Sequence, residues 1–328
     1  MPELTVRVWR YLVPLLLLGL AVHLMLPQLT TLERMFQVVK HIILWAVAIA
    51  LVAQILSYIG NGYLLKSIIA VAGQHMSISS STLIATAASS IGLVAGGLIG
   101  NAAATYQWVH SHGVSAEGAI LAGWLPTMFN NVALILVSFV GLLYLLIVHR
   151  LSTWLALSFS IILMIFCLII GLLLWGIHNR LRITKLVTWI ANSWASFRHR
   201  PFDSSRINRT MKQLFSAYEV LRVGGWQGPS LGAFLNIAFD MLTLYFLFVA
   251  AGHAVGPGIL LLGYGLPQLL GKVTFLPGGV GIVEGSMAAM YDSLGVPDPI
   301  SVTVILTYRV ISFWLPASIG FLIIPYLK

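Results

Sequence analysis

The sequence predicts an all-α, polytopic membrane protein with about six full spans and two re-entrant broken helices in an inverted-repeat arrangement. The chain of 328 residues is 59% hydrophobic, only 8% of its residues are charged, and long apolar runs recur along it. A soluble globular chain carries about 25% charged residues. Because about 20 consecutive apolar residues cross the hydrocarbon core as a helix, each long run is interpreted as a span.

The full spans follow the continuous apolar runs. Arg7 and Arg10 precede the first run, as in a signal peptide, but no small-residue cleavage site follows it, so we expect a retained first helix. The run at 120–148 is long enough for one tilted helix. The six spans are expected at 12–29, 41–59, 120–148, 153–177, 230–252 and 300–325.

Two further regions are apolar but interrupted by small residues. Residues 82–118 are rich in Ser, Ala and Gly, and residues 258–295 contain the stretch "KVTFLPGGVGIVEG". Glycine permits positive φ and close backbone approach, and Pro277 stops a helix. Non-helical backbone at membrane depth is tolerated only where it is buried in protein or lines a water-filled cavity. Each region is therefore expected to be re-entrant, which means that it enters and leaves the membrane on the same face.

A weak internal repeat relates the two interrupted regions. Gly96-Gly97 and Gly113 recur 182 positions later as Gly278-Gly279 and Gly295, and a long apolar span follows each set. Inverted-topology repeats are common in transporters, where broken helices meet near the bilayer midplane. The amide groups freed at the start of the second half-helix are expected to face an anion such as a lipid phosphate.

Basic residues orient the predicted helices. Nine of the eighteen Lys and Arg residues fall between Arg180 and Arg222, and the positive-inside rule places that window in the cytoplasm. With both interrupted regions re-entrant, Arg7 and Arg10 lie on the same side. The same count places 60–80 and Lys328 inside, and 149–152 and 253–257 outside.

The predicted organisation is a single membrane domain, 1–328, in the inner (cytoplasmic) membrane with a cytoplasmic N-terminus. It comprises a first half, 1–177, and a second half, 230–328. A cytoplasmic connector, 178–229, joins them, and its basic and apolar faces indicate amphipathic helices in the inner interface.

Glu284 and Arg309 are expected to meet inside the membrane. A charged side chain at the bilayer centre costs about 2.5–3.5 kcal/mol on insertion scales, so two in neighbouring elements pair with each other or with a substrate. One alternative is a structural ion pair that ties the re-entrant loop to the last helix. In the other, Arg309 binds a phosphate in bidentate fashion while Glu284 orients it.

Lys272 and Asp240 also lie within apolar sequence. Lys272 either contacts a phosphate or extends to the outer interface. Asp240 either relays a proton, contacts a cationic headgroup, pairs with Lys272 or Arg309, or bonds in its protonated form to the backbone of a neighbouring helix. Asn130 and Asn131 are expected to join helices rather than to bind substrate.

The stretch "LPGGVGIVEGSMAAMYDSLGVP", followed by "LTYRVISFWLPASIGFL", resembles the membrane region of lysylphosphatidylglycerol synthases, a flippase-like domain. The resemblance implies a prokaryotic inner-membrane protein whose relatives translocate lipids. The matching motif residues are Pro277, Gly278, Gly279, Gly281, Glu284, Gly285, Leu294, Gly295, Val296, Pro297, Tyr308, Arg309, Phe313, Trp314, Leu315 and Pro316.

The sequence departs from the family pattern in two places. Val283 stands where many relatives carry Arg, and the charges usual in the family's first half are absent, leaving Asn101, Asn130 and Asn131 as polar remnants. The soluble aminoacyl-transferase domain of some relatives has no counterpart, so we do not expect this chain to be the synthase.

The expected function is translocation of a phospholipid or isoprenoid-type lipid between leaflets. The alternatives are a membrane-embedded lipid-modifying transferase and a membrane subunit that recruits a soluble lipid-modifying enzyme through 178–229. Membrane lipids, anionic phospholipid above all, are the expected partners, a homo-oligomer stays open, and no nucleic acid, cofactor, metal or catalytic residue is expected. The expected substrate-binding residues are Asp240, Lys272, Gly278, Gly279, Gly281, Glu284, Tyr308 and Arg309.

Overall fold

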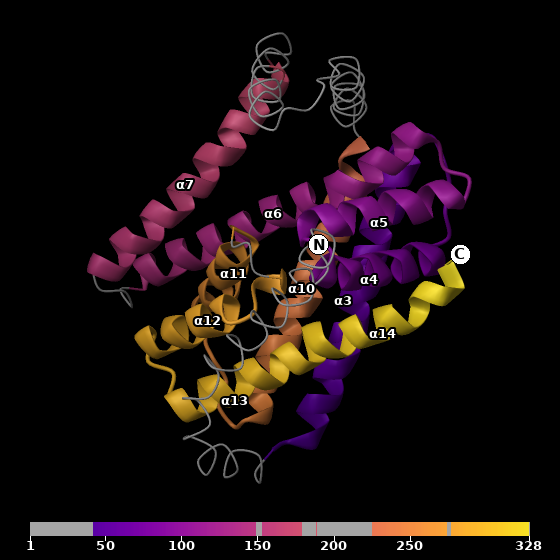
Figure 1. Ribbon diagram of the computed structural model, residues 1–328. Coiled ribbons are helices and arrows are strands. Elements are labelled where there is room, and N and C mark those ends of the chain that lie inside the picture. Colours follow the sequence, from indigo (N-terminus) through magenta and orange to yellow (C-terminus); the bar gives the residue numbers. More distant parts are fainter. Residues whose placement is uncertain (1–41, 149–152, 179–187, 189–224, 274–276, 328) are drawn as a thin grey trace, which may run out of the picture.

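The computed structural model describes residues 42–148, 153–178, 188, 225–273 and 277–327, and all regular elements in these ranges are helices (Figure 1). In the first half they are α3 (Leu44–Val71), α4 (Ile78–Val94), α5 (Leu98–Ser111), α6 (Ala116–Ile147) and α7 (Thr153–His178). In the second half they are α10 (Gln227–Ala250), α11 (Pro257–Val273), α12 (Ile282–Ser293), α13 (Asp298–Arg309) and α14 (Leu315–Ile323). Two short 3₁₀ helices lie at Pro277–Gly279 and Ile324–Leu327, and a π-helical segment at Val310–Trp314 joins α13 to α14.

Four of the described helical segments are long and apolar enough to cross a membrane: α3, α6, α10 and the segment Asp298–Leu327. They confirm a polytopic helical membrane protein. Helix α7 adds a predominantly apolar helix of 26 residues at the place predicted for a span, whereas the span predicted at 12–29 lies outside the described residues. The total of six therefore stays a prediction. Helix α3 also runs twelve residues beyond the predicted end at 59.

Helices α3 and α10 form an antiparallel pair at the centre of the molecule. The backbone N–H of Ile43, at the start of α3, donates to the carbonyl of Ala250, at the end of α10, over 3.0 Å. A Cβ at Gly60 would lie 2.7 Å from the backbone nitrogen of Asn236, so the two backbones nearly touch. Such close approach at small residues is how membrane helices gain packing contacts, and it explains why α3 continues past residue 59.

The two interrupted regions are helical hairpins. Helix α4 contacts α5, and α11 contacts α12. These helices have 17, 14, 17 and 12 residues, or about 18–26 Å at 1.5 Å per residue, which is less than the roughly 30 Å core. Each hairpin follows the C-terminal end of α3 or α10. Because α3 and α10 are antiparallel, the hairpins enter from opposite faces, which confirms the inverted arrangement.

The repeat predicted from a few glycines extends to the helix ends on either side of Gly113 and Gly295. Helix α5 ends at Ser111 and α12 at Ser293, while α6 begins at Ala116 and α13 at Asp298, so both pairs are 182 residues apart. The backbone repeats as well. Gly96 and Gly97 have φ of 87° and 64°, Gly278 and Gly279 both have φ of 63°, and Gly113 and Gly295 have φ of 87° and 82°.

Each hairpin packs against the helical segment that follows the hairpin of the other half. Helix α4 lies along α14, and α11 lies along α6 (Figure 1). The Ser90 hydroxyl on α4 donates to the carbonyl of Ala317 on α14 over 2.9 Å. Glycine again allows the contact, because a Cβ at Gly320 would lie 2.7 Å from the carbonyl oxygen of Thr86. The halves are therefore interlocked.

The interlocked hairpins bring their breaks together. A Cβ at Gly278, in the break of the second hairpin, would lie 3.1 Å from Cδ2 of Leu93, near the break of the first. The same Cβ would overlap the ring of Phe313, so this position requires glycine for space as well as for its positive φ.

The helix ends also agree with the predicted grouping of the loops. Leu327 packs in one cluster with Ile69 at the end of α3, and the start of α11 at Gly258 lies against Tyr144 near the end of α6. Which of the two faces is cytoplasmic stays a prediction. Nearly all of the predicted connector lies outside the described residues.

Candidate functional site

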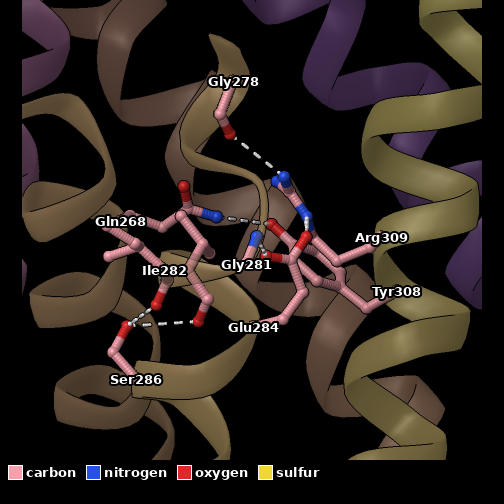
Figure 2. A network of polar contacts seen from close by, with 9 residues as sticks. Gln268, Gly278, Gly281, Ile282, Glu284, Ser286, Tyr308 and Arg309 are labelled. Atoms are coloured by element: carbon pink, nitrogen blue, oxygen red, sulfur yellow. Dashed lines mark hydrogen bonds and ion pairs between the residues drawn. The ribbon is translucent and has the colours of Figure 1, made fainter. Parts of the chain in front are cut away.

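A buried ion pair closes the break of the second hairpin. Glu284 lies in the first turn of α12 and Arg309 ends α13, and Nε of Arg309 lies 2.5 Å from Oε1 of Glu284 (Figure 2). Only 4% of Glu284 and 5% of Arg309 is exposed. The sequence-based expectation that these two charges meet inside the membrane is confirmed.

Further contacts of the ion pair join the hairpin break to α13. The other carboxylate oxygen of Glu284 accepts from the backbone N–H of Gly281 over 2.7 Å. Arg309 donates from Nη2 to the carbonyl of Gly278 over 3.0 Å, and its guanidinium carbon lies 4.1 Å from the centre of the Phe313 ring. A carboxylate of the chain itself thus occupies the start of α12, where an external phosphate was expected. In this conformation the pair has the geometry of the structural alternative.

A second polar cluster is centred on Asp240 of α10. One carboxylate oxygen accepts from the hydroxyls of Tyr264 on α11 and Tyr308 on α13, both over 2.7 Å. The Tyr308 hydroxyl in turn accepts from Nε2 of Gln268 over 3.1 Å. Among the described residues, Asp240 therefore bonds to side chains of neighbouring helices rather than to a backbone, Lys272 or Arg309.

Lys272 is an exposed cation beside these buried clusters. It lies in the last turn of α11 and donates from Nζ to Oδ1 of Asn131 on α6 over 2.8 Å. Asn130, the preceding residue on α6, accepts at Oδ1 from the Asn236 amide over 3.2 Å. Both asparagines join helices, as predicted.

The charged groups lie at similar depths. Asp240 lies ten residues before the end of α10, Glu284 nine before the end of α12, and Arg309 eleven after the start of α13. At 1.5 Å per residue each is about 15 Å from the helix end, or half of the roughly 30 Å core. The clusters therefore lie near the bilayer midplane. Charged and polar groups are costly at this depth, so their presence indicates a functional site.

The structure gathers most of the predicted site residues in two neighbouring clusters linked through α13. Gly278, Gly281, Glu284 and Arg309 form the ion-pair cluster, and Tyr308 belongs to the Asp240 cluster. Gly279 has a packing role, because a Cβ there would lie 2.8 Å from Cα of Gly271.

Sequence analysis missed two members of the Asp240 cluster, Tyr264 and Gln268. Their spacing of four residues inside an apolar helix places them on one face, and this was the available signal. A third member is Gln54 of α3. Its side chain is 5% exposed and bonds to the Asp240 carboxyl group, while its Oε1 has no hydrogen-bond partner among the described residues.

An apolar cavity of about 500 Å³ lies between α6 and α10. Ala133 and Val137 of α6 and Ala233 and Ile237 of α10 line it. Phe234, also in the lining, is 64% exposed. A cavity of this lining accepts hydrocarbon.

Comparison with known proteins gives one family and several relatives. Residues 11–320 match the family model of the lysylphosphatidylglycerol synthase TM region. A UPF0104 membrane protein of Methanothermobacter thermautotrophicus is 32% identical over 94 residues, which are 29% of this chain and 28% of that protein. One from Methanocaldococcus jannaschii is 22% identical over 162 residues, or 48% of each chain, and one from Pyrococcus horikoshii is 31% identical over 88 residues, or 27% of this chain and 26% of that protein. The matches thus span a quarter to a half of these relatives.

Proposed function

From the premise that this chain belongs to the lysylphosphatidylglycerol synthase TM region family, we propose that it translocates a lipid between the two leaflets of the inner (cytoplasmic) membrane. The lipid is a phospholipid or an isoprenoid-type lipid, and its headgroup crosses the membrane beside the meeting hairpins while its chains stay in hydrocarbon. The proposal includes a cytoplasmic N-terminus and anionic phospholipid as the favoured partner.

The meeting of the two hairpin breaks near the midplane supports this proposal most directly. Hairpins that enter from opposite faces bring their breaks together at Leu93 and Gly278. Non-helical backbone at this depth is either buried in protein or lines a water-filled cavity, and charged groups there often mark substrate pathways. In secondary transporters the same arrangement allows access to alternate between the two faces.

Lys272 is the proposed first contact for a phosphate. Its side chain is exposed and bonds to a neutral amide among the described residues, so the ammonium group keeps further donors. Arg309 is already bound to Glu284 and to a carbonyl. A phosphate would therefore reach Arg309 only after the hairpin break moves.

The apolar cavity between α6 and α10 provides a place for the lipid chains in this proposal. Asn131, the partner of Lys272, and Val132, in the cavity lining, are adjacent on α6. A headgroup at Lys272 thus lies next to a surface that accepts hydrocarbon.

Translocation is tested with the purified chain in phosphatidylcholine vesicles that contain a trace of fluorescent phosphatidylglycerol. Dithionite destroys only the fluorophore in the outer leaflet, so further loss of fluorescence reports movement between leaflets. We expect the protein to accelerate this loss and Lys272→Met to slow it about tenfold or more, because a charge-assisted hydrogen bond contributes about 1.5–3 kcal/mol.

Lys66→Met is the matched control. Lys66 lies on α3 outside the clusters described above, so its removal should leave the rate unchanged. Vesicles with wild-type protein that lose fluorescence no faster than protein-free vesicles would refute the proposed function. An equal effect of the two lysine substitutions would refute the role of Lys272.

A further inference from the structure

The first half contains a polar cavity that sequence analysis did not predict. Its volume is about 80 Å³. Helices α3, α4, α5 and α6 surround it, and its polar lining consists of three amides and two hydroxyls without a charged group. These are the side chains of Asn61, Asn101, Thr105, Thr127 and Asn130.

The cavity is the repeat-related counterpart of the ion pair in the second half. Ala102 and Thr127 stand 182 residues before Glu284 and Arg309, at the equivalent places on α5 and α6. Both replacements have shorter side chains. Thr127, at the place of Arg309, lines the cavity, so part of the space that the ion pair fills in the second half is open in the first.

The lining offers hydrogen-bonding groups that the described part of the chain leaves unused. Neither the Asn61 amide nor the Thr127 hydroxyl has a hydrogen-bond partner among the described residues. Asn101 and Asn130 use their carbonyl oxygens to accept from Thr105 and from Asn236, so the NH₂ groups of both stay free to donate. Unpaired polar groups inside a membrane are costly, and a polar ligand offsets this cost.

The chemistry of the lining selects an uncharged ligand group. A phosphate or carboxylate would lose hydration here without an opposite charge, because no charged side chain lines the cavity. Hydroxyl groups donate and accept, as the amides do. Since one water needs about 10–15 Å³, a volume of about 80 Å³ has room for several hydroxyl groups.

The polar and apolar cavities follow each other along α6. Pro126 and Asn130 line the polar cavity, and Ala133 and Val137, three and seven residues after Asn130, line the apolar cavity. Residues at this spacing share a helix face. On α10, Asn236, which bonds to Asn130, precedes Ile237 of the apolar lining. A headgroup in the polar cavity thus leads to a chain in the apolar cavity.

The polar cavity lies about as deep as the ion pair. Asn61 is ten residues before the end of α3, and Asn101 is ten before the end of α5, or about 15 Å from that face. A headgroup held there has moved halfway across the membrane.

We propose that this cavity binds the uncharged, hydroxyl-rich headgroup of a glycolipid whose hydrocarbon chain lies between α6 and α10. The inference rests on the proposed function, since it names the substrate class that the first half handles on the path between leaflets.

The test is equilibrium binding of radiolabelled monoglucosyl dioleoylglycerol to the purified full chain in detergent micelles. Unlabelled dioleoylglycerol and dioleoylphosphatidylglycerol compete, so the sugar and the phosphate are varied on identical chains. We expect monoglucosyl dioleoylglycerol to bind best. Thr127→Val, which keeps the side-chain shape and breaks no bond within the described protein, should weaken its binding about threefold to tenfold.

Thr307→Val is the matched control, because the Thr307 hydroxyl bonds to the carbonyl of Thr303 in its own helix. It should leave binding unchanged, whereas Asn61→Leu should weaken binding of the glucolipid as Thr127→Val does. Equal binding of the glucolipid and dioleoylglycerol, or tighter binding of the phosphatidylglycerol, would overturn the inference. So would the same glucolipid preference in wild type, Thr127→Val and Asn61→Leu.

The vesicle assay separates this inference from the proposed function. Specific glucolipid binding without movement of either lipid would leave the site in place and refute translocation. Movement of phosphatidylglycerol without specific glucolipid binding would support translocation and refute the glycolipid site.

Discussion

Removing either member of the Glu284–Arg309 pair should destabilise the protein far more than removing both. The two groups are 2.5 Å apart and almost fully buried. Loss of one partner leaves an uncompensated buried charge, at a cost of about 3–5 kcal/mol. Since whole domains are stable by about 5–15 kcal/mol, we expect Arg309→Met or Glu284→Gln to lower the thermal unfolding temperature strongly.

The double variant Glu284→Gln/Arg309→Met should recover most of this loss. The side-chain carbonyl that Glu284→Gln introduces can still accept from the backbone N–H of Gly281, and the thioether that Arg309→Met introduces can pack on the Phe313 ring. The bond to the Gly278 carbonyl is lost, at a cost of about 1 kcal/mol. The effects of the two substitutions should therefore differ from additivity by about 2 kcal/mol or more.

The assay is thermal unfolding of the purified variants in detergent, together with the vesicle assay for translocation. Additive effects of the two substitutions would refute a direct buried pair. Translocation separates the two alternatives for Arg309. A stable but inactive double variant indicates that the guanidinium acts on the substrate, and a stable, active one indicates that the pair only holds the hairpin.

Two further substitution pairs test the hairpin break and the Asp240 cluster. Gly278→Ala should lower the free energy of unfolding by at least about 1–2 kcal/mol, because φ is positive and a neighbouring ring fills the space. Gly285→Ala, in an open helical position, should be neutral or stabilising in the same thermal unfolding assay. Equal effects would show that the break tolerates a side chain. Tyr308→Phe should lower the unfolding temperature more than Tyr264→Phe, because it also leaves the Gln268 amide without its partner, and the reverse order would contradict the bonding described.

Local features of the sequence were sufficient for the architecture. Hydropathy places spans because an apolar helix of sufficient length is stable in lipid whatever its neighbours are. Glycines at 96, 97, 278 and 279 indicate breaks because glycine adopts positive φ readily. In the structure all four have φ above 60°. The spacing of 182 then relates the halves, since helices of similar length, with 14 and 12 residues, follow the two breaks.

Tertiary structure alone decided which polar groups meet. Asp240 and Tyr264 share a hydrogen bond only because α11 packs beside α10. Lys272 meets Asn131 only because α11, of the second half, packs against α6, of the first half. The polar cavity depends on the same packing, since a short side chain such as Thr127 leaves open space only where no neighbouring side chain fills it. Sequence patterns report the preferences of one segment, whereas ion pairs and cavities depend on the distances between several segments, which only the packed fold sets.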